Sequence, residues 1–356
     1  MKKISLSSIS SIINDAKKGK IFILVDNKNR ENEGDLIIPA SKANPKTINF
    51  MAKHGRGLIC LALTSKQVDK LSLPLMSAVN KARMQTAFTV SIEARKGITT
   101  GISAFDRAKT IKVAINQNSK KKDIVSPGHV FPLVARNGGV LERAGHTEAS
   151  VDISKLANLN PSSVICEVMN EDGRMARFDD LLKFAKKHNL KIASIEDLIS
   201  YRLKNEKLMF NIQNKIIKIK KIGFLNLNVF RNKLDGIEHY VLSRGTFNDS
   251  KSPRVRVISV NIPKGIEKLN NKLYLNSVKY LSRYNNFALI VIRNKNLKVI
   301  KDESIRSTNI LRYYGIGAQI IKDLKIKNMI LVSRSKKKII GLDGYGIKIT
   351  RQEIIK

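Results

Sequence analysis

The chain has 356 residues, of which 42% are hydrophobic, so it can form one large domain or two medium-sized domains with their own cores. It has no run of about eighteen apolar residues, so we expect no membrane-spanning helix. The net charge of +37 would suit nucleic acid, but the lysines are spread along the chain and no nucleic-acid-binding motif accompanies them. We attribute the charge to compositional bias and do not expect nucleic acid as a partner.

The first residues of the chain and its two cysteines predict the cellular compartment. The first residues contain a short apolar stretch that serines interrupt, which is typical of an ordinary first helix rather than a signal peptide. Cys60 and Cys166 have neither the spacing of metal ligands nor that of a disulfide framework. We therefore expect two reduced thiols in a cytoplasmic protein.

Short apolar runs alternate with amphipathic segments in the first half of the chain. We predict strands over residues 21–25, 58–63 and 164–169, and helices over residues 45–53, 178–188 and 195–201. Asn44 is a suitable N-cap for a helix that starts at Pro45. This alternation predicts an α/β (α+β) fold, with helices on both faces of a sheet in an α-β-α arrangement.

The second half has the same kind of pattern. We predict strands over residues 240–242, 255–260, 287–292 and 329–332, and helices over residues 273–283 and 316–324. The charged tract at residues 202–207 has the composition of a linker. We therefore predict a first domain over residues 1–203 and a smaller α/β domain over residues 208–356.

A first charged cluster, Arg-Glu-Asn-Glu-Gly-Asp, occupies residues 30–35, directly after a predicted strand. Such a run is often only a solvated loop. However, Gly34 permits a tight turn that lets carboxylates converge, and the end of a strand is a usual place for a site in an α/β sheet. Carboxylate oxygens suit Mg²⁺, and a neighbouring arginine suits a phosphate. The pattern leaves both interpretations open.

A second cluster covers residues 138–148 and contains Arg143, Gly145, His146 and Thr147. An arginine, a glycine backbone and a hydroxyl are groups that hold a phosphate, and a histidine can bind a metal or move a proton. The alternative is a glycine-rich loop with a structural histidine. Glu167 is a third candidate, because it is a carboxylate in an apolar strand where a core residue is expected.

Six sequence blocks resemble the 3,4-dihydroxy-2-butanone-4-phosphate synthase family. They are RENEGD at 30–35, HGRGLIC at 54–60, TTGIS at 99–103, PGHVFPL at 127–133, RAGHTEA at 143–149 and ICEVMN at 165–170. They follow the order of that family over residues 1–203. The resemblance implies conversion of D-ribulose 5-phosphate to L-3,4-dihydroxybutan-2-one 4-phosphate and formate. It also implies a homodimer with sites at the subunit interface and two Mg²⁺ (or Mn²⁺) ions per site.

The same resemblance implies roles for individual residues. It makes Glu31 and His146 metal ligands, and it makes His129 and Glu167 catalytic. From the chemistry we expect Asp35 to be catalytic as well, as a group that moves protons. The substrate would be bound by Arg30, Glu31, Asp35, Arg143, Ala144, Gly145, His146, Thr147 and Glu167. This assignment agrees with the chemistry, since forming an enediol and releasing formate needs metal-polarised oxygens and groups that move protons.

The second half resembles GTP cyclohydrolase II at residues 234–239, 254–257, 314–320 and 341–346. That family holds a catalytic zinc with three cysteines, whereas residues 205–356 contain no cysteine. We therefore expect no zinc and no GTP hydrolysis. Three roles remain open for this half: a stabilising or dimerising module, a module that binds a nucleotide or another anion, or a cyclohydrolase with residual activity.

Overall fold

The computed structural model describes residues 6–28, 30–81, 84–220, 222–247, 252–261, 265–266, 271–293, 315–335 and 342–355. The chain divides into two compact units, residues 1–199 and 200–356. The division falls within helix α7 (Ile195–Asn205). Each unit is built on its own seven-stranded sheet.

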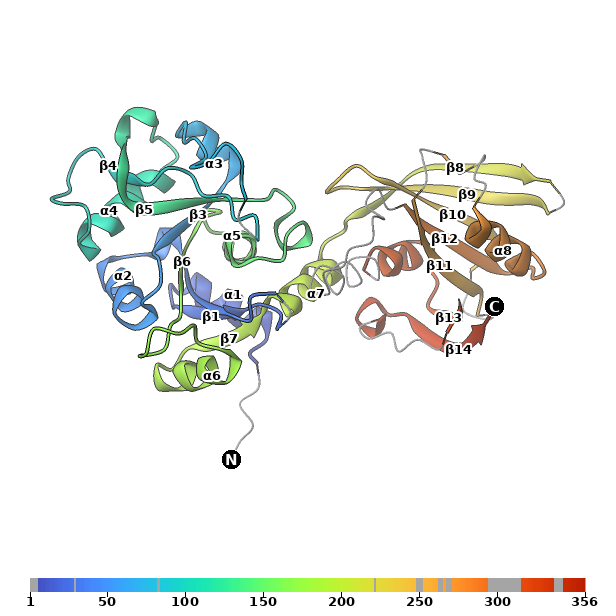
Figure 1. Ribbon diagram of the computed structural model, residues 1–356. Coiled ribbons are helices and arrows are strands. Elements are labelled where there is room, and N and C mark those ends of the chain that lie inside the picture. The colour runs from blue at the N-terminus through green and yellow to red at the C-terminus, as the bar shows by residue number, and fades with distance from the viewer. Residues whose placement is uncertain are drawn as a thin grey trace. The chain divides into compact units, whose positions relative to one another are not determined.

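The sheet of the first unit has the strand order β4-β5-β3-β6-β2-β1-β7 (Figure 1). Its strands are β1 (Phe22–Val25), β2 (Gly34–Pro39), β3 (Cys60–Thr64), β4 (Ile92–Ala94), β5 (Ile124–Ala135), β6 (Ser163–Glu167) and β7 (Lys191–Ser194). The pairs β1–β7 and β3–β5 are parallel, and the other pairs are antiparallel. The strands predicted over residues 21–25, 58–63 and 164–169 are thus confirmed as β1, β3 and β6.

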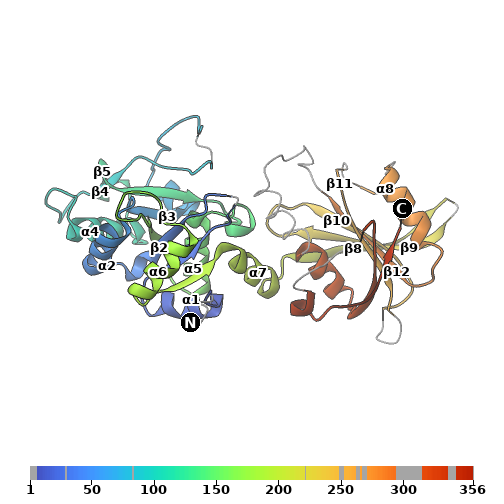
Figure 2. The same ribbon diagram turned by 60° about the horizontal axis from the view of Figure 1, so that its bottom comes forward.

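Helices cover both faces of this sheet. The helices are α1 (Ile9–Lys17), α2 (Pro45–Phe50), α3 (Ser65–Lys70), α4 (Ala104–Ile115), α5 (His146–Leu156) and α6 (Phe178–Lys187). Helix α5 crosses one face in contact with five of the strands and with α1. Side chains of α2, α4 and α6 join the main hydrophobic core on the other face. This confirms the predicted α-β-α layering, and Figure 2 shows the same layers from a second direction.

Helix α2 begins as predicted. The side chain of Asn44 accepts a hydrogen bond from the backbone N–H of Thr47 at 3.2 Å, and Pro45 is the first helical residue. The α-helix ends at Phe50, earlier than predicted, and the chain continues as a π-helical turn over Met51–Gly55. Arg56 follows with a positive φ of 68°, which turns the chain into β3.

The sheet of the second unit has the order β14-β13-β11-β12-β10-β9-β8. The strands are β8 (Met209–Ile219), β9 (Gly223–Asn232), β10 (Glu238–Arg244), β11 (Arg254–Val260), β12 (Phe287–Arg293), β13 (Asn328–Ser333) and β14 (Lys348–Ile354). Helix α8 (Lys272–Leu281) packs on β11 and β12, and residues 315–323 form a further helical segment. The strands and helices predicted here are confirmed, although the β8–β9 hairpin and strand β14 were not predicted. Residues 314 and 341 of the cyclohydrolase-like segments lie outside the described residues.

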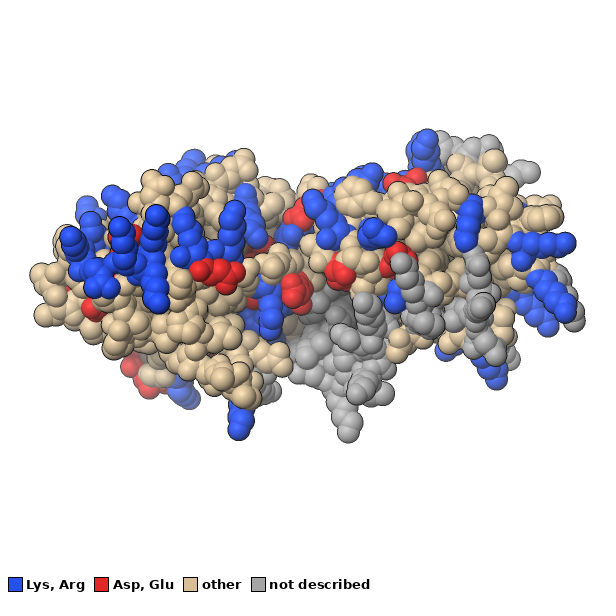
Figure 3. All heavy atoms as spheres, turned by 90° about the horizontal axis from the view of Figure 1, so that it is seen from above, with Lys and Arg blue, Asp and Glu red and all other residues tan. Residues whose placement is uncertain are grey.

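Basic side chains occur over the visible face of both units, with acidic side chains among them (Figure 3). This distribution agrees with a compositional origin of the charge. In the part of the chain that the structure describes, no helix combines the length and the apolarity that crossing a membrane requires.

Candidate active site

The loop between β1 and β2 is organised by the carboxylate of Asp26. This carboxylate accepts hydrogen bonds from the backbone N–H of Glu31 at 3.1 Å and of Glu33 at 2.9 Å. Arg30 donates to the same carboxylate at 2.7 Å and also contacts the carboxylate of Glu31. Asp26 is buried, so these bonds are shielded from water and fix the loop that carries Glu31.

Gly34 has a different role from the one predicted. The left-handed residue of the loop is Asn32, with a φ of 56°, whereas Gly34 is the first residue of β2. A Cβ atom at Gly34 would lie 2.6 Å from a methyl carbon of Leu181 on α6. The glycine is therefore required by close packing of strand against helix, and the turn itself is made by Asn32.

His146 is the first residue of α5, and it is 7% exposed. Its Nδ1 lies 3.8 Å from Oδ1 of Asp35, and its Nε2 is buried without a partner among the described residues. Burial lowers the pKa of His146, although the charge of Asp26 opposes this effect. The imidazole is thus neutral at neutral pH, and its unpartnered nitrogen can bind a cation.

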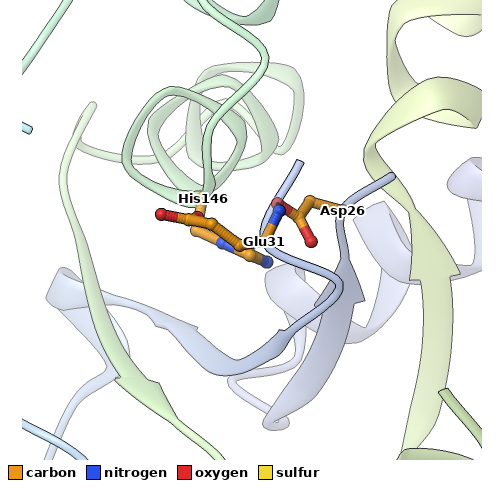
Figure 4. A group of neighbouring side chains, drawn as sticks. All are labelled: Asp26, Glu31 and His146. Carbon is orange, nitrogen blue, oxygen red and sulfur yellow. Dashed lines mark hydrogen bonds between the residues drawn. The ribbon is translucent and has the colours of Figure 1, made fainter. Parts of the chain in front are cut away.

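Asp26, Glu31 and His146 form a cluster in which their potential ligand atoms all lie within 4.8 Å of one another. Figure 4 shows the three side chains gathered between the loop after β1 and the start of α5. Two carboxylates and a neutral imidazole suit a divalent cation. Glu31 and His146 were candidates from the sequence, but Asp26 was missed. Its position at the end of a predicted strand was the signal that could have identified it.

Asp35 and Glu167 are direct neighbours across the sheet, because the antiparallel register of β2 and β6 pairs them. Burial raises the pKa of Asp35 well above its ordinary value, and the charges of Glu167 and Glu31 raise it further. Glu167 is half-buried at the end of β6, rather than within the core, and its carboxylate accepts a hydrogen bond from the N–H of Leu58 at 2.9 Å. Gly57 permits this approach, since its Cβ would lie 2.5 Å from Oε2 of Glu167.

Arg143 lies just before α5 and is held by protein groups. Its Nη1 donates to the buried Glu148 at 2.6 Å, and its Nη2 donates to the carbonyl of Met84 at 2.9 Å and to the hydroxyl of Thr86 at 3.0 Å. Gly145 caps α5, and a Cβ there would lie 2.3 Å from Nη1 of Arg143. Ala144 is half-buried and Thr147 is buried. The first turn of α5 thus presents backbone N–H groups beside an arginine.

His129 lies apart from the cluster. It is on β5, where its Nδ1 contacts the carboxylate of Glu93 on β4, and its side chain is 44% exposed. The strand order β5-β3-β6-β2 separates it from Asp35 by three strand spacings, or about 14 Å. Within one chain, the structure therefore brings Glu31, His146, Asp35 and Glu167 together, but not His129.

The site combines a buried cluster of hard ligands, a neighbouring pair of carboxylates and a helix amino terminus on an α/β scaffold. These are features of a metal-dependent enzyme. The family model of 3,4-dihydroxy-2-butanone 4-phosphate synthase matches residues 10–201, and the model of GTP cyclohydrolase II matches residues 279–353. The chain belongs to the 3,4-dihydroxy-2-butanone 4-phosphate synthase family.

Two relatives cover almost the whole chain. Riboflavin biosynthesis protein RibBA of Aquifex aeolicus is 42% identical over 98% of this chain and 92% of its own length. The 3,4-dihydroxy-2-butanone 4-phosphate synthase of Photobacterium phosphoreum is 40% identical over 97% of this chain and 98% of its own length. The similarity therefore extends through both units.

Solved structures agree with these relatives. RibBX of A. baumannii, a two-domain 3,4-dihydroxy-2-butanone 4-phosphate synthase, matches with a TM-score of 0.83 and 38% identity, over 98% of this chain and 99% of that chain. A 3,4-dihydroxy-2-butanone 4-phosphate synthase in complex with two magnesium ions matches with a TM-score of 0.54 and 38% identity. It covers 56% of this chain and 98% of its own chain.

Proposed function

We propose that the first unit is a working 3,4-dihydroxy-2-butanone 4-phosphate synthase, which converts D-ribulose 5-phosphate to L-3,4-dihydroxybutan-2-one 4-phosphate and formate in riboflavin biosynthesis. The observation that carries this proposal is the cluster of Glu31, His146 and Asp26 beside the pair Asp35–Glu167. The two free, buried cysteines fit the reducing cytoplasm, where we place the enzyme.

The residues of the cluster fit a divalent cation, which we propose is Mg²⁺ or Mn²⁺, with two ions per site. Glu31 and His146 would hold the metal, and the free Nε2 of His146 is the available imidazole donor. When bound, the metal would polarise neighbouring sugar oxygens and acidify the adjacent C–H bond. Asp26 supplies a second carboxylate, which both positions the loop and faces the same space. The neighbour with two magnesium ions supports this proposal.

The chain's own carboxylates would move the protons. Burial and the charge of Glu167 raise the pKa of Asp35, so this carboxylate accepts a proton more readily than an ordinary one. Glu167 is oriented by the N–H of Leu58 and lies beside Asp35. The sugar phosphate would be held by Arg30 and by the first turn of α5, with Arg143, Ala144, Gly145 and Thr147.

We further propose that the enzyme is a homodimer in which each site lies at the subunit interface. The position of His129, three strands from Asp35 on an exposed part of the sheet, supports this arrangement. The partner subunit's His129 would then reach the metal cluster of the first chain. For the second unit, the absence of cysteine from residues 205–356 argues against zinc and against GTP opening.

One assay tests the proposed activity. We expect the purified chain to release formate from ribulose 5-phosphate in the presence of Mg²⁺, to stop when the metal is chelated, and to resume when Mg²⁺ is restored. GTP, offered in parallel, should yield no formate. Absence of formate from ribulose 5-phosphate with either Mg²⁺ or Mn²⁺ would refute the synthase function.

Replacing Asp35 with asparagine should separate stability from activity. The pKa of Asp35 is higher in the folded protein than in the unfolded chain, so ionisation of this carboxyl opposes folding. The penalty grows as the pH rises from the unfolded-state pKa through the folded-state pKa. At pH 8 Asp35→Asn should therefore unfold at a higher urea concentration than the wild type, whereas kcat should fall by about 10²–10⁴-fold through loss of the proton carrier. The exposed Asp172→Asn is the control. Unchanged kcat would remove Asp35 from the mechanism.

A further inference from the structure

Arg177, at the start of α6, reaches the loop that carries Glu31. Its Nη1 donates to the backbone carbonyl of Glu31 at 2.6 Å and to that of Asn32 at 3.0 Å, and it contacts Oε1 of Glu33 at 3.4 Å. Asn32 is also the left-handed residue of this loop, with a φ of 56°. The guanidinium therefore binds the loop at its turn and at the residue whose carboxylate belongs to the cluster of potential metal ligands.

The segment that carries Arg177 is itself fixed to the chain that follows β6. The N–H of Ala176 donates to the carbonyl of Val168 at 2.9 Å, and Val168 is the first residue after β6. The N–H of Arg177 donates to the carboxylate of Asp180 at 3.1 Å, and the side chain of Asn170 donates to the same carboxylate at 3.3 Å. The base of the arginine side chain is thus held in place, so the guanidinium is a fixed support for the loop.

The bonds made by Arg177 differ in kind from those made by Asp26 and Arg30. The latter two residues belong to the loop and its edge, so their bonds to Glu31 fix the shape of the loop. Arg177 lies 146 residues further along the chain than Glu31, so its bonds fix the position of the loop relative to the rest of the unit. A metal site needs both, because Glu31 must keep its place opposite His146 on a different element.

The alternative is that Arg177 only solvates a turn, as exposed arginines often do. Its side chain is 48% exposed. Arg174, three residues earlier, shows what such a residue looks like: its side chain is 85% exposed and pairs with Asp172, two residues away, at 2.8 Å. Arg177 instead directs its guanidinium to backbone carbonyls of a distant loop, which favours a role in the site that this loop forms.

We propose that Arg177 is a positioning residue for the metal site, because its hold on the carbonyls of Glu31 and Asn32 keeps the β1–β2 loop in the conformation that binds the divalent cation. This inference rests on the proposed synthase function. Without the guanidinium the loop would occupy other conformations as well, and the apparent affinity for the cation would fall with the fraction of competent loops. A saturating cation concentration would select the competent conformation again, so turnover would return.

Calorimetric titration of the full chain with Mg²⁺ tests this role independently of activity. Binding should be about 10–100-fold weaker in Arg177→Ala than in the wild type, as is usual for loss of a group that orients a metal ligand. The Mg²⁺ concentration that half-saturates formate release should rise by the same factor, whereas kcat at saturating Mg²⁺ should stay close to the wild-type value. Arg177→Lys should be intermediate, since it keeps a charged donor without the planar fork. Arg174→Ala is the matched control and should bind Mg²⁺ like the wild type.

Free guanidinium ion provides a second measurement. Arg177 and Asn32 line a cavity of about 560 Å³, so removal of the arginine side chain leaves room for this ion beside the loop. Guanidinium chloride at non-denaturing concentration should strengthen Mg²⁺ binding by Arg177→Ala, and potassium chloride at the same ionic strength should not. Arg174→Ala should respond to neither salt.

The proposal is overturned if Arg177→Ala binds Mg²⁺ as tightly as the wild type, if saturating Mg²⁺ fails to restore its kcat, or if potassium acts as well as guanidinium. It is also overturned if Arg177→Ala and Arg177→Lys both unfold at a much lower temperature than Arg174→Ala, because the residue would then be structural. A wild-type chain that binds Mg²⁺ but releases no formate would refute the synthase function, and the calorimetric comparison would still decide whether Arg177 positions the metal site.

Discussion

His146→Ala and Glu31→Ala are each expected to lower kcat for formate release by about 10³-fold or more at saturating Mg²⁺, which corresponds to about 4 kcal/mol of lost transition-state stabilisation. His146 offers the unpartnered Nε2, and Glu31 is the carboxylate that the Asp26-organised loop presents to it. If they hold the metal as proposed, a water molecule in place of either side chain would position it less firmly. The measurement is steady-state formate release as a function of Mg²⁺ concentration.

Two controls match these variants. His188→Ala removes a histidine that stacks with His54 and Phe184 away from the cluster, and Glu171→Ala removes an exposed carboxylate. Both should keep near-normal turnover. Calorimetry should also show weaker Mg²⁺ binding in the two site variants, independently of activity. Near-normal turnover of either site variant at saturating Mg²⁺ would make the metal assignment wrong.

Mixed dimers should recover activity from two inactive chains. If each site combines the metal cluster of one subunit with the partner subunit's His129, a dimer of His129→Ala with Glu31→Ala has one intact site and one doubly damaged site. Dimers purified through two different affinity tags should then have about half of the wild-type kcat, by the two-fold symmetry of such an assembly. Each variant alone should be nearly inactive.

The pairing of Glu31→Ala with His146→Ala is the matched control. Both changes damage the same half of the site, so the mixed dimer has no intact site and should stay inactive. Recovery in neither mixture would mean that His129 acts within its own chain, and a monomeric elution of the active enzyme would contradict the dimer directly. Recovery in only the first mixture would identify the subunit that supplies each residue.

Much of the fold could be predicted because many of its helices and strands follow from local sequence patterns. The Asn44–Pro45 helix start and the β-branched runs at residues 21–25 and 255–260 were sufficient for their elements. Helix α5 was not predicted, since its buried side chains include the polar Glu148 and Asp152. These carboxylates are satisfied by groups that lie just before the helix in the chain, among them the side chain of Arg143 and the N–H of Val140. Periodicity of apolar residues cannot reveal such a helix.

The sequence by itself determined the family, through six blocks in order, and the candidates Glu31, His146, Asp35 and Glu167. Only the tertiary structure decided how they combine. It added Asp26, whose carboxylate fixes the loop, and it placed His129 three strand spacings from Asp35. It also paired Arg254 with Glu353 and left Nε and Nη1 of Arg256, two residues along the same strand, without a hydrogen-bond partner in the described residues. The physical reason is that pairing and burial depend on strand register and on residues far away in the chain, and these determine which charges a folded protein leaves available for a ligand.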